Sequence, residues 1–133
     1  MEILKLEKTG KNTELFEQLK KLDNDFEFQG KNDSESLFYI IEDEKILGYA
    51  IVELAERACL KRIFINKKLR NNGFGSILLK YLINWLINNN FDSLVVENHK
   101  HMNNFLEKQR FVKNKDGFYE LGNFSEERKQ SRR

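Results

Sequence analysis

The stretch Leu60–Asn89 constrains the fold of this chain more than any other. It starts with an apolar, β-prone segment, Lys61–Ile65, continues through polar and basic residues, and turns at Gly73–Gly75 into the apolar run Ser76–Ile87. This order predicts a strand, a tight turn and a helix. A glycine turn at a helix N-terminus presents unpaired backbone N–H groups at the positive end of the helix dipole. The stretch therefore predicts a seat for a phosphate group.

Three cations beside the turn, Lys67, Lys68 and Arg70, strengthen the preference for an anion. The glycine spacing excludes two common nucleotide-binding loops. A P-loop needs four residues between its glycines and then a lysine, and the dinucleotide fingerprint needs a further glycine where this chain has Leu78. A glycine turn that only caps a buried helix is the alternative interpretation.

A wider pattern extends the first interpretation. The pattern Arg70-x-x-Gly73-x-Gly75, after a strand and before a helix, resembles the acetyl-CoA signature of the Gcn5-related N-acetyltransferase (GNAT) family. Downstream, Phe105–Phe111 is similar to the ending of the family's last helix, an aromatic residue followed by Tyr-Glu-Lys-Leu-Gly-Phe. The resemblance covers roughly Ile46–Leu121, and the N-terminal third matches by element order only.

The resemblance implies an α/β (mixed α+β) single domain, in which helices flank a twisted, mixed, mostly antiparallel sheet with one βαβ unit for the cofactor. It implies transfer of an acetyl group from acetyl-CoA to a primary amine of a small molecule, peptide or protein, by direct attack in a ternary complex and without a metal. The strand backbone would pair with the pantetheine arm, the turn would hold the pyrophosphate, and Lys67, Lys68 or Arg70 would reach the ribose phosphate. The implied cofactor-binding residues are Ile63, Phe64, Ile65, Arg70, Asn71, Asn72, Gly73, Phe74, Gly75 and Ser76.

The chain departs from the family pattern at the positions that carry acid–base chemistry. Cys59 stands where some relatives place a Glu that acts as the general base, and Leu106 stands where many place a Tyr that acts as the general acid. His99 matches the family's Asn at the start of the last helix, and Arg110 its Gly before the final Phe. By position, the replacement candidates are Tyr119 as the acid and Glu53, Glu56 or His99 as the base.

These departures leave more than one function open. General acid–base help is worth about 10²–10⁴-fold, whereas proximity alone supplies roughly 7–11 kcal/mol, so an active acetyltransferase remains the favoured hypothesis. A non-catalytic module that binds or senses CoA is the alternative. An interaction protein that uses the apolar helix and the basic tail is a third.

Several of these side chains also have purely structural interpretations. Cys59 behaves as a small apolar residue when it is buried. Tyr119 is a typical sheet residue. His99 and His101 form a metal pair only if a third ligand joins them, and the spacing indicates none.

Hydrophobic periodicity predicts the remaining elements. We expect strands over 2–6, 37–41, 46–54 and 93–97, a helix after Asn12 or Thr13, a helix over 100–108, and a hairpin at Asp116–Gly117. The segment 23–36 is polar, with Phe26 and Phe28 as apolar anchors, and the family places this segment over the substrate groove. The helix over 76–89 is apolar on most of its surface, so we expect a second element or a second subunit to cover it, which leaves a homodimer open.

Composition bounds the class of protein. A chain of 133 residues forms one domain, which we place at 1–124, followed by a charged, disordered tail at 125–133. The formal net charge is +2, and this tail accounts for it, so the neutral body argues against nucleic-acid binding. A lone cysteine excludes an internal disulfide, and the absence of a signal-like or membrane-spanning apolar run predicts a cytoplasmic protein. The lack of proline and the wealth of Lys, Asn and Ile suggest an AT-rich bacterium.

Overall fold

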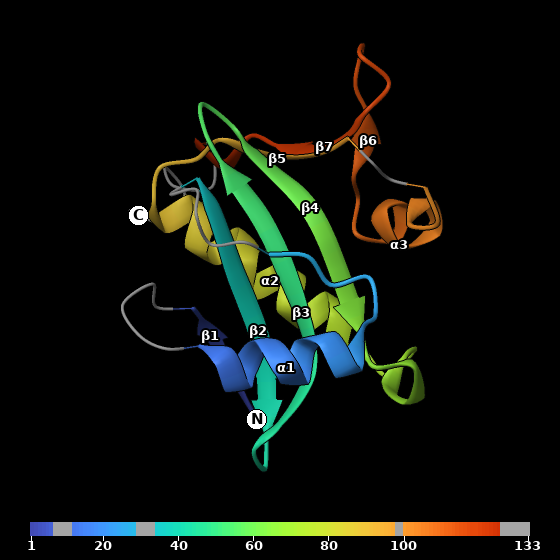
Figure 1. Cartoon of the computed structure of the whole chain (residues 1–133). Helices are drawn as coiled ribbons and strands as arrows, with labels where there is room; N and C mark the ends of the chain where they lie inside the picture. Colours follow the sequence, from blue (N-terminus) through green and yellow to red (C-terminus); the bar gives the residue numbers. More distant parts are fainter. Residues whose placement is uncertain (7–11, 29–33, 98–99, 126–133) are drawn as a thin grey trace.

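The computed structural model describes residues 1–6, 12–28, 34–97 and 100–125. Within them, seven strands form one mixed sheet in the order β1-β2-β3-β4-β5-β7-β6. Helix α1 lies on one face of the sheet and helix α2 on the other (Figure 1), which confirms the predicted α/β architecture. The elements are β1 (Glu2–Lys5), α1 (Thr13–Leu22), β2 (Glu35–Glu42), β3 (Lys45–Leu54), β4 (Ala58–Ile65), η1 (Lys67–Leu69), α2 (Phe74–Asn88), β5 (Ser93–Val96), α3 (Asn103–Lys108), β6 (Val112–Lys113) and β7 (Tyr119–Gly122).

The sheet has two parts that differ in how their strands are paired. Strands β1 to β4 are antiparallel neighbours, as short turns between successive strands require. Strand β5 pairs parallel to β4, and β7 and β6 then continue antiparallel. The parallel pair is connected through α2, so β4, α2 and β5 form the predicted βαβ unit.

Helix α2 begins at Phe74, two residues earlier than we predicted. Gly73 is its N-cap residue and has a φ of 85°, a left-handed conformation that glycine adopts without strain. The Ile77 N–H donates to the Gly73 carbonyl at 3.0 Å, so the glycine pair belongs to the first helical turn. We predicted a start at Ser76 because the apolar run begins there, but a helix can begin before its apolar face, and a glycine at the cap carries no interior propensity penalty.

Two hydrophobic clusters cover the two faces of the sheet. On the α2 face, one cluster contains residues of β2, β3, β4, β5, α3 and β7 and therefore spans both parts of the sheet. On the α1 face, the second cluster ends at β4 and contains no residue of β5, β6 or β7 among the described residues. Among the described residues, only the hydrophobic cluster on the α2 face therefore packs against both parts of the sheet.

The apolar surface of α2 is partly covered. Leu78, Leu79, Leu82 and Leu86 are buried against the sheet, whereas Ile77 and Tyr81 are each 39% exposed. In the part of the chain that the structure describes, no second element covers these two residues, and a homodimer stays a prediction. That same part contains no helix with the length and hydropathy needed to cross a bilayer.

Candidate active site

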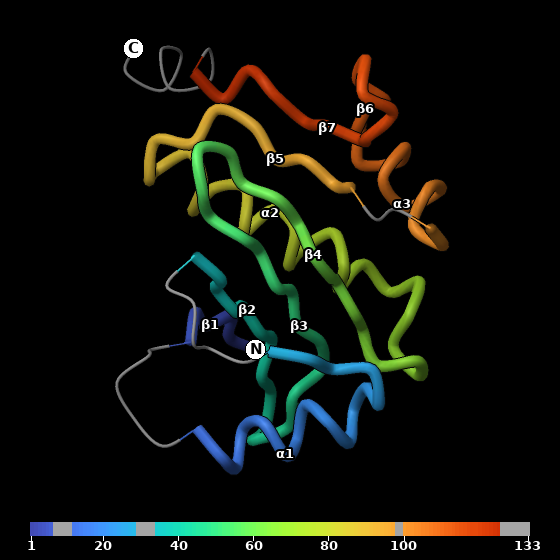
Figure 2. Tube along the Cα trace, turned by 45° about the horizontal axis from the view of Figure 1, so that its top comes forward, coloured from blue at the N-terminus to red at the C-terminus, as the bar shows by residue number. Residues whose placement is uncertain are grey.

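A cavity opens where β4 and β5 separate. The two strands pair only at Ala58–Leu94 and Cys59–Val95, and Figure 2 shows them diverging from there toward α3. The opening has a volume of about 1200 Å³, and its walls come from β4, the 69–76 segment, the 100–109 segment and Asp25. The β5-facing edge of β4 beyond Cys59 therefore carries backbone groups that no strand of the described sheet pairs.

A bulge in β4 decides which side chains reach this cavity. Ile51 pairs with Arg62 and Val52 with Leu60, so Lys61 is an extra residue. Leu60 and Ile63 both belong to the α2-face cluster, although an even strand would send two residues three apart to opposite faces. Arg62 instead contacts residues on the α1 face, so the cavity receives side chains from both faces of the sheet.

The first turn of α2 forms one wall of the cavity. The N–H groups of Phe74, Gly75 and Ser76 precede the first possible helical hydrogen bond, and all three residues line the opening. A Cβ at Gly75 would come within 3.3 Å of the Phe105 ring, so glycine lets α3 approach this turn closely. The Gln109 side chain strengthens the contact because its Nε2 donates to Ser76 Oγ at 2.7 Å.

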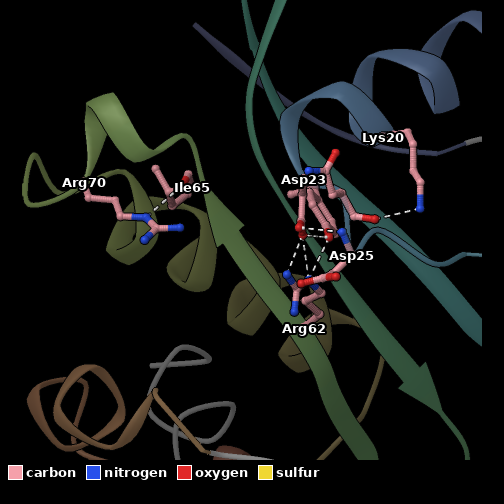
Figure 3. Close-up of polar contacts among 8 residues, drawn as sticks. Lys20, Asp23, Asp25, Arg62, Ile65 and Arg70 are labelled. Carbon is pink, nitrogen blue, oxygen red and sulfur yellow. Dashed lines mark hydrogen bonds and ion pairs between the residues drawn. The ribbon is translucent and has the colours of Figure 1, made fainter.

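Arg70 is the basic residue of the predicted loop that lines the cavity. Its Nε donates to the Ile65 carbonyl at 3.1 Å (Figure 3), and its guanidinium lies 5.0 Å from the centre of the Phe64 ring. Lys67 and Lys68 belong to η1 and do not line the cavity. Of the two lysines and Arg70, Arg70 therefore has the best geometry for a phosphate within the opening.

The 100–109 segment adds further positive charge opposite Arg70. The cations Lys100 and Lys108 line the cavity, as does His101, and no acidic side chain of the described residues lines this end with them. Unpaired N–H groups and several cations suit the pyrophosphate and ribose phosphate of a CoA molecule. Every predicted cofactor-binding residue except Asn72 lines the same cavity.

A buried polar network lies at the other end, on the α1 face (Figure 3). Asp23 Oδ2 accepts hydrogen bonds from the Tyr49 hydroxyl at 2.5 Å and from Arg62 Nε at 2.7 Å, and Arg62 Nη2 lies 2.6 Å from the same oxygen. Burial raises the pKa of Asp23, but the hydrogen bonds from Tyr49 and Arg62 outweigh it and hold this pKa below its usual range. Burial, together with the bond to Asp23, raises the pKa of Tyr49 well above its usual range.

Three of the four predicted acid and base residues, Tyr119, Glu53 and Glu56, do not line the cavity. The Tyr119 hydroxyl donates to Glu107 Oε1 at 2.8 Å, which raises the pKa of this phenol, and neither residue lines the opening. Glu53 lies 3.8 Å from Lys61 Nζ, so it is one residue removed from the cavity, and Glu56 lies in the β3–β4 turn before β4 begins. His99 is outside the described residues.

The two positions that depart from the family pattern are both buried. Leu106 is 0% exposed within the α2-face cluster. Cys59 is 8% exposed, and burial raises the pKa of its thiol, which disfavours the thiolate needed for a nucleophile. The burial of Cys59 agrees with its structural interpretation as a small apolar residue.

Sequence reasoning missed His101 and the Asp23 network. His101 was considered only as half of a metal pair, yet it lines the cavity. Among the described residues, no three His, Cys, Asp or Glu side chains gather as they would around a metal ion. The partners Asp23 and Arg62 are 39 positions apart, and no local sequence pattern connects such a pair.

Comparison with known proteins identifies the family to which this fold belongs. The model of the acetyltransferase (GNAT) family matches residues 2–111. The chain belongs to the GNAT family. A search of curated proteins found no match for it.

Solved structures share the fold over nearly the whole chain. Gcn5 from Tetrahymena has a TM-score of 0.72 at 15% identity, with 92% of this chain and 96% of that chain covered. The protein YhhK from Escherichia coli, solved with bound coenzyme A, has a TM-score of 0.71 at 19% identity, with 91% and 97% covered. The ribosomal-protein-S18-alanine N-acetyltransferase from Escherichia coli has a TM-score of 0.69 at 18% identity, with 92% and 93% covered. At these identities the likeness shows the fold.

Proposed function

We propose that this GNAT protein transfers an acetyl group from acetyl-CoA to a primary amine. The observation that carries the proposal is the cavity beside β4, which combines an unpaired strand edge, the free N–H groups of the first turn of α2, and the cations Arg70, Lys100 and Lys108. An unpaired strand edge suits an extended amide-containing arm such as pantetheine. The helix N-terminus and the cations suit the phosphates of CoA.

The reaction needs little from the protein beyond alignment. The amine nitrogen attacks the thioester carbonyl, a C–N bond forms, the C–S bond breaks, and CoA leaves with the electron pair as a thiolate that takes up the proton lost by the amine. An alkyl thiol has a pKa of about 8.5 and leaves readily. Holding amine and thioester together in one cavity supplies roughly 7–11 kcal/mol, which is more than acid–base help provides.

His101 is the residue on the cavity wall that is best suited to move the proton. Imidazole is the side chain most often used in general acid–base catalysis, and Tyr119, Glu53 and Glu56 do not line the opening. We therefore add His101 to the four candidates from the sequence. His101→Gln is expected to lower kcat while the affinity for acetyl-CoA is retained.

The alternative function is a module that binds CoA without turnover. Leu106 stands at the position where many relatives carry a Tyr, and it is completely buried. This favours the alternative because no phenol at that position can donate a proton in the cavity. Turnover of any amine would exclude it. CoA binding without turnover across a broad amine panel would establish it.

The test compares two glycine variants that share one backbone conformation. Gly73 and Gly117 have φ values of 85° and 83°, and a Cβ would meet nothing within 4 Å at either position. Gly73 lines the cavity, whereas Gly117 lies between β6 and β7 and does not. Gly73→Asp and Gly117→Asp thus introduce the same strain and the same charge at two different places.

Thermal stability with and without acetyl-CoA is the measurement. Ligand at about a hundred times its Kd stabilises a protein by roughly 2.7 kcal/mol. We expect this stabilisation in the wild type and in Gly117→Asp and its loss in Gly73→Asp, because the new carboxylate repels the pyrophosphate. A wild type that acetyl-CoA does not stabilise would refute both CoA-dependent functions.

A further inference from the structure

The two ends of the cavity differ in electrostatic character. At the α2–α3 end, Arg70, Lys100 and Lys108 line the wall without an acidic neighbour among the described residues. At the α1-face end, the charged side chains on the wall are Asp25, Lys61 and Arg62. The first end matches a polyanion, so under the proposed function the second end is left for the acceptor.

Both cations at the α1-face end are already compensated. Arg62 forms its ion pair with Asp23 at 2.6 Å. Lys61 Nζ lies 3.8 Å from Glu53. Within the described residues, Asp25 has no cationic partner, so its carboxylate is the one charge on this part of the wall that remains to be neutralised.

Asp25 is held in place by the buried network. Its backbone N–H donates to Asp23 Oδ1 at 3.0 Å, and the Phe26 N–H donates to the Asp23 carbonyl at 2.9 Å. Phe26 is itself buried and packs edge-on against Tyr49, with ring centres 5.2 Å apart. Figure 3 shows Asp25 beside Asp23 and Arg62. The exposed carboxylate of Asp25 therefore sits on a turn that the core fixes.

We propose that Asp25 binds a second positive charge on the acceptor, so that the preferred acceptors are small diamines. The amine that reacts must be neutral when it attacks, whereas a second ammonium group stays charged throughout and gains a lasting ion pair. This inference rests on the proposed function, since it assigns the acceptor end of the same cavity.

The test uses three amines that differ only at their far end. 1,4-Diaminobutane carries an ammonium group there, 1-aminobutane a methyl group and 4-aminobutanoate a carboxylate. Their binding to the protein saturated with CoA is measured by calorimetry, and their acetylation is measured with acetyl-CoA. We expect the wild type to bind and acetylate the diamine best and the aminobutanoate worst.

Asp25→Asn removes the charge and keeps the shape of the side chain. Its Kd and KM for the diamine should rise on the order of tenfold, and its values for 1-aminobutane should not change. Glu27→Gln is the matched control, because Glu27 is an exposed carboxylate two residues along that does not line the cavity. Asp25→Lys should reverse the ranking in favour of 4-aminobutanoate.

Two results would overturn the inference: equal diamine affinity in Asp25→Asn and wild type, or a wild type that prefers 4-aminobutanoate. Diamine binding that depends on Asp25 without any acetyl transfer would support the inference and refute the proposed catalysis. Acetyl transfer that ignores Asp25 would do the opposite.

Discussion

The two ends of the cavity are formed by different kinds of group, backbone at one end and side chains at the other. The α2–α3 end is formed mainly by backbone, namely the free N–H groups of a helix start and the unpaired edge of β4, with exposed cations around them. The α1-face end is formed by side chains, with Asp23 buried between Tyr49 and Arg62 and with Asp25 beside them. Recognition of a common cofactor can use the backbone, which every sequence supplies, whereas recognition of a particular acceptor needs particular side chains.

Energetics separate the two ends as well. An exposed cation near a helix start contributes little to folding because solvent screens it. A buried carboxylate that accepts several hydrogen bonds leaves its donors unsatisfied when it is removed. Mutations at the first end are therefore expected to affect ligand affinity, and mutations in the network at the second end are expected to affect stability.

The largest stability effect is expected for Asp23→Ala. Asp23 is 5% exposed and accepts from Tyr49, whose side chain is fully buried, so the variant leaves the Tyr49 hydroxyl without its acceptor. We expect a loss of about 2–3 kcal/mol in the free energy of unfolding, measured by urea denaturation.

Arg70→Ala is the counterpart at the other end. It should change stability by less than about 1 kcal/mol while it weakens acetyl-CoA binding. Equal stability losses in Asp23→Ala and Arg70→Ala would contradict the division between the two ends.

An intermediate effect is expected for Gly48→Ala, which acts on the strand that both ends share. A Cβ at Gly48 would lie 2.5 Å from Ile65 Cδ1 and 2.7 Å from the Phe64 carbonyl oxygen. Ile65 can rotate, but the backbone of β4 must move, so we expect a loss of about 2 kcal/mol together with weaker acetyl-CoA binding. Gly122→Ala is the control, because its Cβ would meet only ordinary contacts at 3.7 and 3.9 Å. Undiminished affinity in Gly48→Ala would show that the position of β4 does not govern acetyl-CoA binding.

The smallest effect is a pH dependence that belongs to the α1-face end alone. The pKa of Asp23 is lower in the folded protein than its usual value, so the unfolded chain binds more protons as the pH falls. The stabilisation is therefore complete above the unfolded pKa and is lost from about pH 5 downward as the pH approaches the folded pKa. Urea midpoints measured from neutral to acidic pH should fall less in Asp23→Asn than in the wild type. Parallel curves for the two proteins would contradict this assignment.

The strand, turn and helix that form the α2–α3 end could be predicted from the sequence because their signals are local. The strand before Asn66, the glycine turn and the apolar run after it lie within one continuous stretch, and periodicity identifies each element. The same locality explains the success of the antiparallel pairs β2–β3 and β3–β4, whose turns are short. The errors at this end were small, such as α2 starting at Phe74 instead of Ser76 and α3 at Asn103 instead of residue 100.

The α1-face end was not predicted because nothing local specifies it. The contact between Asp23 and Arg62 depends on the bulge at Lys61, which turns Arg62 toward the α1 face. A single extra residue in a strand leaves no clear mark in the hydrophobic pattern. Tyr119, Glu53 and Glu56 were chosen by residue type and order, and neither criterion measures the distance to a cavity.

The difference in packing between the two faces of the sheet has a consequence for how the sheet can move. Strands β4 and β5 are held by two residue pairs, and the cluster that spans both parts of the sheet lies only on the α2 face. Packing on the α2 face can therefore act as a hinge between the two parts of the sheet. Thermal motion is expected to widen the cavity toward the α1 face more easily than toward the α2 face, and such widening would leave the first turn of α2 in place.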